Sequence, residues 1–336
     1  LGVPSPSGGQ RLSATAMQSW AACPFRYFLG QVLGLTDRPD PETVTAIAAT
    51  DRGSLLHEVL ERFLGEAITA PGGPPRPGEP WPAAARARMA EIAEDVFERF
   101  RGEGRTGREL LWRLERAFLL GDLAAFLVHD AQRRAAFAST PVAVEEPFGL
   151  DGEPPLTLDV GAGRTLAFRG YIDRVDATPD GGHVVYDYKS GKGSHYGELD
   201  QDPVRQGQVL QLGLYAEAVA QRRGGEVATW FWMLNSAGDY QLHGGPWTAA
   251  HRARFVEVLT AITDGIEAGT FPARPGDWNL FFRQHDNCRY CAFDRLCPRD
   301  RHEHERAKAG APELAVLDRL LPPEPAADDA EAVASP

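Results

Sequence analysis

Before Pro141, apolar residues recur along the chain at helical spacing. The clearest case is "TDRGSLLHEVLERFLGEA" (50–67), in which Leu, Val and Phe residues form one broad apolar face. Ser13 is the predicted N-cap of the first helix. The Pro/Gly-rich stretch 70–82 is predicted to be a connector, because proline breaks a helix and cannot donate a backbone hydrogen bond. The predicted helices cover residues 12–35, 50–67, 83–101 and 107–137.

From Pro141 onward the pattern becomes that of short strands, rich in β-branched and aromatic residues. The runs "VAVEEPFGL", "TLAFRGYIDRVDAT" and "GHVVYDYKSG" are predicted strands, and the turn "TPDGG" joins the last two. A helix over 202–225 follows, then the strand "EVATWFWMLN" paired with "GDYQLHGG", and a last long helix over 248–269. This order predicts an α/β fold with a mixed β-sheet flanked by helices and an N-terminal helical elaboration.

Composition and charge narrow the class of protein. Of the 336 residues, 43% are hydrophobic and 24% charged, which is typical of a globular protein. No apolar run is long enough to span a membrane and residues 1–11 do not resemble a signal peptide, so we expect a cytoplasmic protein that begins with a flexible arm. The start on Leu1 suggests a piece of a longer polypeptide. The net charge of −12 argues against indiscriminate nucleic-acid binding, and the acidic, Ala/Pro-rich tail 309–336 is predicted to be mostly disordered.

An acid and a lysine share one face at the end of a predicted strand, in "HVVYDYKSGKG" (183–193). Asp187 and Lys189 are two residues apart, and Asp173 lies toward the end of the neighbouring strand of the same hairpin. An acid of "VEEPF" on the preceding strand can complete the cluster. Converging carboxylates of this kind suit Mg²⁺ or Mn²⁺, whereas a surface salt bridge is the alternative interpretation of the D-x-K triplet alone.

Four segments together resemble a known family. The words "GYIDRVD" (170–176), "VVYDYKSG" (184–191) and "QLGLYAEAV" (211–219), preceded by "RGSLLHEVLERF" (52–63), are similar to motifs of the PD-(D/E)xK nuclease superfamily, in particular its RecB-like branch. The motifs occur in the family's order. The resemblance implies a restriction-endonuclease-like sheet core and metal-dependent hydrolysis of DNA.

The resemblance also implies roles for individual residues. Asp173 and Asp187 would bind the catalytic Mg²⁺ (or Mn²⁺), Lys189 would be the catalytic lysine, and His57 would add a metal ligand from the N-terminal helical part. A partly buried helix histidine beside a leucine face is the alternative for His57. The family's acid-x-Pro-Phe word favours Glu145 over the adjacent Glu146 as the remaining acid, although only one of the two can face the cluster.

A further motif lies on the helix after the catalytic strand. Gln211 and Tyr215 are four residues apart and share a helix face, and the resemblance implies a Q-x-x-x-Y motif that contacts the lysine or the DNA backbone. The alternative is a surface glutamine with a tyrosine packed on the sheet. Gln208 is a weaker companion, and Lys192 is a candidate phosphate contact outside the motif.

The four cysteines predict a metal site. Three of them have the spacing C-x₂-C-x₅-C, and the fourth stands in a Cys-Pro pair near the other end of the chain. Four thiolates accept either Zn²⁺ or an iron–sulfur cluster. The RecB-like branch with this layout, which includes AddB-type nucleases, implies a 4Fe-4S cluster that staples the first helix to the C-terminal segment. The proposed ligands are Cys23, Cys288, Cys291 and Cys297.

We therefore interpret residues 12–308 as one nuclease domain of RecB/AddB type that acts in DNA end resection and recombinational repair. It would comprise a helical part (12–140), a catalytic α/β core (141–270) and an iron–sulfur segment (271–308). The sequence contains no G-x-x-x-x-G-K-[ST] loop, so a helicase motor would have to be a partner or lie outside this sequence. A stand-alone nuclease of the CRISPR-adaptation type and a nuclease-dead, DNA-binding scaffold remain the alternatives.

Overall fold

The computed structural model describes residues 5–36, 45–194, 196–197, 199 and 201–322. A five-stranded mixed sheet lies at its centre, in the order β2-β5-β6-β7-β8, with β6 and β7 parallel and the other neighbours antiparallel. This confirms the predicted mixed sheet flanked by helices. The strands are β2 (Thr140–Phe148), β5 (Gly170–Ala177), β6 (His183–Lys189), β7 (Val227–Met233) and β8 (Leu242–Pro246).

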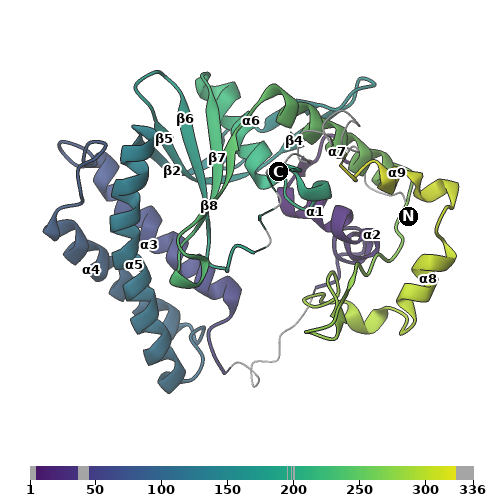
Figure 1. Ribbon diagram of the computed structural model, residues 1–336, viewed down its shortest axis with the longest axis horizontal. Helices are drawn as coiled ribbons and strands as arrows, with labels where there is room; N and C mark the ends of the chain where they lie inside the picture. The colour runs from purple at the N-terminus through teal and green to yellow at the C-terminus, as the bar shows by residue number, and fades with distance from the viewer. Residues whose placement is uncertain (1–4, 37–44, 195, 198, 200, 323–336) are drawn as a thin grey trace, which may run out of the picture.

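Two helical layers cover the two faces of this sheet (Figure 1). One layer holds the predicted N-terminal helices, and the other combines the first helix with the two helices that follow β6 and β8. The first layer is α3 (Ala49–Thr69), α4 (Ala83–Gly102) and α5 (Glu109–Phe137), and the second is α1 (Ala14–Ala22), α6 (Gln211–Arg223) and α7 (Ala249–Glu267).

Strand β6 shows why the sheet is apolar on both faces. Val184, Tyr186 and Tyr188 pack among the side chains of α3, α4 and α5, whereas Val185 packs among those of α1, α6 and α7. Successive side chains of a strand point to opposite faces, so a run without polar interruptions is expected where both faces are covered. Asp187 and Lys189 continue the α6 side of this alternation as the strand ends.

Two predicted elements are divided in the structure. The run 165–178 forms β4 (Thr165–Phe168) and β5, because the Arg169 N–H bonds to the carbonyl of Leu12 and carries β4 into a separate sheet. That sheet has the order β1-β4-β3, with β1 (Arg11–Leu12) and β3 (Leu156–Asp159). The helix expected over 12–35 is broken at Cys23, whose φ of −155° is extended, as expected for a residue before proline. After the break come α2 (Pro24–Tyr27) and a π-helical turn, Phe28–Val32.

Ser13 caps α1 as predicted, since its side chain accepts a hydrogen bond from the N–H of Ala16. The helix expected from residue 202 begins at Gln211, after a 3₁₀ turn at Arg205–Gly207 in which Gln206 has a φ of 55°. A residue in this left-handed conformation cannot continue an α-helix. Among the described helices, none has the length and apolarity that a membrane crossing requires.

Both terminal segments contact α7. In the predicted arm, Ser7 donates a side-chain hydrogen bond to Glu267 at 2.6 Å. In the predicted tail, Leu320 is fully buried and Arg254 donates to its carbonyl at 2.6 Å. The tail is therefore ordered through residue 322, unlike the prediction, because Leu320 finds an apolar site; residues 323–336 lie outside the described residues. The remaining elements are β9 (Trp278–Asn279), β10 (Gln284–His285), α8 (Arg301–Ala307) and α9 (Ala315–Asp318).

A buried ionic cluster joins α5 to β5. The Arg174 guanidinium lies 2.6 Å from Asp130 of α5 and 2.6 Å from Asp176 on its own strand. Asp130 also pairs with Arg134 at 2.8 Å, and Asp176 accepts a hydrogen bond from Ser139 at 2.9 Å. All four charged side chains are fully buried. Buried charges require such partners, so the cluster fixes how the helical layer sits on the sheet.

Candidate metal and nuclease site

The hairpin β5–β6 brings two carboxylates together. Its register pairs Arg174 with Tyr186, which places Asp173 opposite Asp187. Both acids are buried, with 8% and 2% of their surface exposed. Asp173 accepts a hydrogen bond at 2.7 Å from the N–H of Tyr188, which fixes the orientation of its carboxylate.

His57 reaches this hairpin from α3. Its Nδ1 lies 3.4 Å from Oδ2 of Asp173, and its Nε2 lies 2.9 Å from the carbonyl oxygen of Tyr188. The leucine-rich face of α3 is buried against α4, α5 and the sheet, so the helix cannot rotate without exposing its core side chains. A nitrogen that faces a carboxylate while the other nitrogen is held by a carbonyl is the arrangement found in metal-binding histidines.

Strand β2 supplies the third carboxylate. The register pairs Val144 with Arg174 and Glu146 with Ile172, so Glu145 lies opposite Asp173. An oxygen of Glu145 lies 4.0 Å from Nδ1 of His57, and His57, Glu145 and Asp173 have ligand atoms within 4.8 Å of one another. Glu146 faces α6 instead and pairs with Arg223 at 2.9 Å.

Glu145 has an unusual backbone conformation. Its φ is 44°, in the left-handed region that residues with a Cβ rarely adopt. Conformations of this kind cost about 1–3 kcal/mol and occur preferentially at functional sites. The two adjacent acids of "VEEPF" therefore differ in surroundings: one faces the cluster from a strained position, and the other is held by arginines of α6.

The acids of the cluster resist ionisation when no cation is near. Burial and the neighbouring Asp187 carboxylate raise the pKa of Asp173 well above its ordinary value. Burial and the Asp173 carboxylate raise the pKa of Glu145 to about 7. These shifts arise because several carboxylates share a poorly solvated site, and a bound divalent cation would reverse them.

Lys189 connects the cluster to α6. It forms an ion pair with Asp187, and its Nζ donates a hydrogen bond to Oε1 of Gln211 at 3.0 Å. Although burial lowers it, the Asp187 carboxylate raises the pKa of Lys189 above its ordinary value, so the amine is charged. Tyr215, one turn after Gln211, is buried edge-on against Phe148, and burial together with Asp187 raises the pKa of its hydroxyl.

Glu61 is a neighbour of the cluster that the sequence motifs did not indicate. It lies one turn after His57 on α3, and its charge contributes to the raised pKa of Glu145. The i, i+4 spacing from His57 was a signal for it. Both residues line an open cleft of about 1010 Å³ that also contacts Glu145, Lys189 and Gln211. Gln208 precedes α6, after the 3₁₀ turn, and does not line this cleft.

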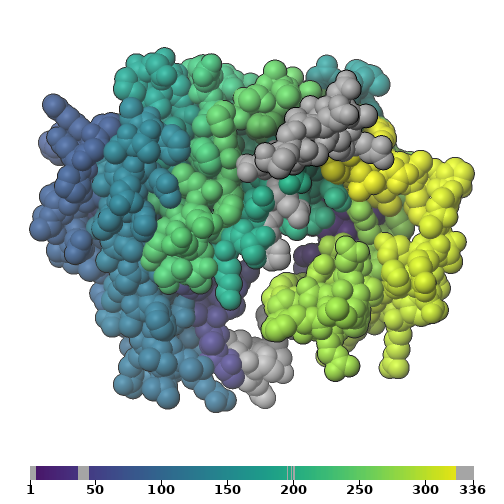
Figure 2. Space-filling model, in the orientation of Figure 1, coloured from purple at the N-terminus to yellow at the C-terminus, as the bar shows by residue number. Residues whose placement is uncertain are grey.

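The four cysteines come from opposite ends of the chain into one region. Cys23 separates α1 from α2, and its Sγ accepts a hydrogen bond from the N–H of Arg274 at 3.4 Å. Asn287, next to Cys288, donates to the carbonyl of Ala22 at 2.8 Å. All four thiols are free, and Cys297 lies near enough to the other three for their charges to raise its pKa, although burial is the larger cause. This region lies in the lime-green lobe of Figure 2, across a hollow from the blue helices.

Comparisons with known proteins agree with this geometry. A family model described as the PD-(D/E)XK nuclease superfamily matches residues 11–298. An ATP-dependent helicase/deoxyribonuclease protein of Symbiobacterium thermophilum is 34% identical over 236 residues, covering 65% of this chain and 18% of that protein. The proteins of the same name from Moorella thermoacetica and Acetivibrio thermocellus are 31% and 29% identical, each covering 62% of this chain and 17% of the relative. The chain thus spans less than a fifth of the length of these relatives.

Proposed function

Because the chain belongs to the PD-(D/E)XK nuclease superfamily, we propose that it is a metal-dependent deoxyribonuclease domain of RecB/AddB type. It would hydrolyse phosphodiester bonds during DNA end resection and recombinational repair. The observation that carries the proposal is the convergence of His57, Asp173 and Lys189 at one end of the β5–β6 hairpin. The names of the relatives, which combine helicase and deoxyribonuclease, support DNA as the substrate and a helicase as the partner.

The donor set suits a hard divalent cation. One imidazole nitrogen and carboxylates of Glu145, Asp173 and Asp187 are ligands that Mg²⁺ and Mn²⁺ accept, and the raised pKa values of Glu145 and Asp173 indicate negative charge without enough compensation. Such an ion, when bound, activates water and neutralises charge on the phosphoryl group. His57 would be held in a ligating orientation by its contact with the Tyr188 carbonyl.

The residues of α6 would position the catalytic amine. Lys189 is charged and buried among Asp187, Gln211 and the ring of Phe231, so it has little freedom to move. Its charge would stabilise negative charge that develops on the scissile phosphate. Gln211 would hold the amine through a hydrogen bond, and Tyr215 would support Asp187 from the next turn.

The cysteine cluster would be a structural staple. We assign Cys23, Cys288, Cys291 and Cys297 to a 4Fe-4S cluster, because the solitary Cys-Pro ligand differs from the paired knuckles of zinc ribbons. The staple would close a loop of most of the domain, which restricts the unfolded chain strongly. In this proposal residues 12–308 act as one nuclease domain, and the helicase motor is supplied elsewhere.

A degradation assay tests the function. Linear DNA is incubated with the wild-type chain, with Lys189→Ala and with Asp187→Ala, each in Mg²⁺ and in Mn²⁺. Loss of DNA only with the wild type supports the proposal, and Glu146→Gln should retain wild-type activity because Glu146 faces α6. Equal activity in all variants would contradict the assigned site, and DNA binding without any cleavage would favour a scaffold.

A further inference from the structure

A second cavity lies beside the nuclease cleft, just beyond the end of β6. Its volume is about 570 Å³, within the range of small-ligand pockets. Neighbouring residues of α3 line the two cavities, Gly53 the cleft and Arg52 this pocket. The loop that follows the catalytic Lys189, residues 190–192, forms another wall. Since three residues of extended chain reach about 11 Å at most, Lys192 lies within one or two nucleotides of Lys189.

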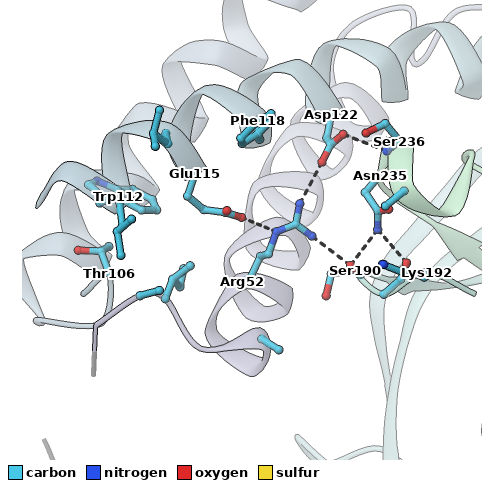
Figure 3. Close-up of a pocket in the computed structure, with 17 residues that line it drawn as sticks. Arg52, Thr106, Trp112, Glu115, Phe118, Asp122, Ser190, Lys192, Asn235 and Ser236 are labelled. Carbon is cyan, nitrogen blue, oxygen red and sulfur yellow. Dashed lines mark hydrogen bonds and ion pairs between the residues drawn. The ribbon is translucent and has the colours of Figure 1, made fainter. Parts of the chain in front are cut away.

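The polar wall of the pocket is already held by its own hydrogen bonds (Figure 3). Arg52 pairs with Glu115 at 2.6 Å and with Asp122 at 3.0 Å, and it donates to the carbonyl of Ser190 at 3.0 Å. Asn235 donates to the same carbonyl at 2.8 Å. Both acids of the pocket are therefore compensated by Arg52, and the loop after β6 is fixed from two sides. Lys192 adds a positive charge at the exposed rim.

The opposite wall is apolar and exposed. Leu111, Leu114 and Phe118 project from α5 into the pocket, although 42%, 57% and 67% of their surfaces are accessible. Exposed apolar side chains that gather on one helix face mark binding surfaces. The pocket thus presents a flat aromatic ring on one side and a lysine on the other.

We propose that this pocket binds one nucleotide of a single DNA strand, next to the phosphate that is cleaved. The base packs against Phe118 and Leu114, and the adjoining phosphate contacts Lys192. Base stacking on aromatic side chains together with a nearby cation is how single strands are bound without sequence preference. The inference rests on the proposed nuclease function and extends it to the substrate. Adjacency to the catalytic strand favours DNA over a partner protein as the occupant.

Binding and cleavage of a fluorescent single-stranded oligonucleotide test the proposal with the 336-residue chain. Affinity is measured by anisotropy in Ca²⁺, and cleavage in Mg²⁺. Phe118→Ala should weaken binding about tenfold and Phe118→Tyr should retain it, because a tyrosine ring also stacks. Lys192→Ala should weaken binding and reduce the slope of log Kd against log salt by about one.

Two variants serve as matched controls. Val128→Ala removes an exposed apolar side chain from the same helix outside the pocket, and Arg86→Ala removes an exposed cation from α4. Both should bind DNA as the wild type does. If Phe118→Ala and Lys192→Ala also bind as the wild type does, the pocket does not hold DNA and a partner protein becomes its occupant. If the binding effects appear but the wild type cleaves nothing, the pocket stands and the nuclease function fails.

Discussion

The side chain of Gln211 accepts a hydrogen bond at 3.0 Å from Nζ of Lys189. This contact joins the first residue of α6 to the last residue of β6. It links two sequence motifs that are separated by 21 residues of intervening chain, so the position of the amine depends on how the helix packs on the sheet. The amine is also paired with Asp187, and the two partners together fix its direction.

Gln211→Ala should lower the rate of DNA cleavage about 10- to 100-fold, because a hydrogen bond to a charged group is worth about 1.5–3 kcal/mol. Metal affinity should change little, since Gln211 is not a ligand in this site. Single-turnover cleavage and Mn²⁺ titration separate the two effects. Gln221→Ala is the control: Gln221 lies on the same helix and donates to Thr157 instead. A Gln211→Ala rate equal to that of the wild type would remove Gln211 from the catalytic group.

The adjacent acids of β2 offer a matched pair of variants. Glu145→Gln should weaken Mn²⁺ binding at least tenfold, because a ligand charge is removed from a buried cluster. Glu146→Gln should leave the affinity unchanged, because its partners are Arg222 and Arg223. Isothermal titration of the two proteins decides between them. Weaker metal binding in Glu146→Gln alone would mean that the other acid of the pair is the ligand.

The buried arginine of β5 should control stability rather than chemistry. Arg174→Met leaves Asp130 and Asp176 buried without their shared partner, which should lower the free energy of unfolding by about 3–5 kcal/mol. Urea unfolding followed by circular dichroism measures the loss. The control Arg88→Met removes an arginine that also pairs with two acids, but on an exposed surface, and should change stability little. A similar small change for both variants would show that the cluster is dispensable.

Some of these features were predictable from the sequence, and others were not. The strand positions of Asp173, Asp187 and Lys189 follow from a period of two and a short turn, so their convergence needed only local reasoning. The role proposed for His57 came from resemblance, since nothing local says that α3 crosses the end of this hairpin. The choice of Glu145 depended on the same resemblance, because adjacent acids are equivalent in composition.

The internal charges were not predictable. Arg174 lies in "IDRVD", where alternating charges resemble a solvated strand, and only its pairing with Asp130 of α5 accounts for its complete burial. Arg52 likewise depends on three segments distant in sequence, which meet only in the folded chain. Tertiary partners decide whether a charge is buried, and hydrophobic periodicity contains no information about them.

The cysteine assignment predicts a coupled loss of cofactor and stability. Cys23→Ser and Cys291→Ser, purified without oxygen, should each lose most of their iron and sulfide and unfold at a lower temperature than the wild type. The reason is that one missing thiolate opens a clip between the first helix and the C-terminal segment. Elemental analysis, visible absorbance and thermal unfolding measure the three quantities. Zinc in place of iron in the wild type would contradict the 4Fe-4S assignment while leaving the staple intact.

Asn287→Ala separates ligation from packing in the same region. Asn287 bridges the two chain ends by donating to the carbonyls of Ala22 and Arg274, at 2.8 and 3.2 Å, and it has no thiol. Its removal should lower the unfolding temperature but leave the iron content near that of the wild type. If Asn287→Ala loses iron as completely as Cys23→Ser, then cofactor loss merely follows destabilisation of the junction. If Cys291→Ser keeps its iron and its stability, Cys291 is not a ligand.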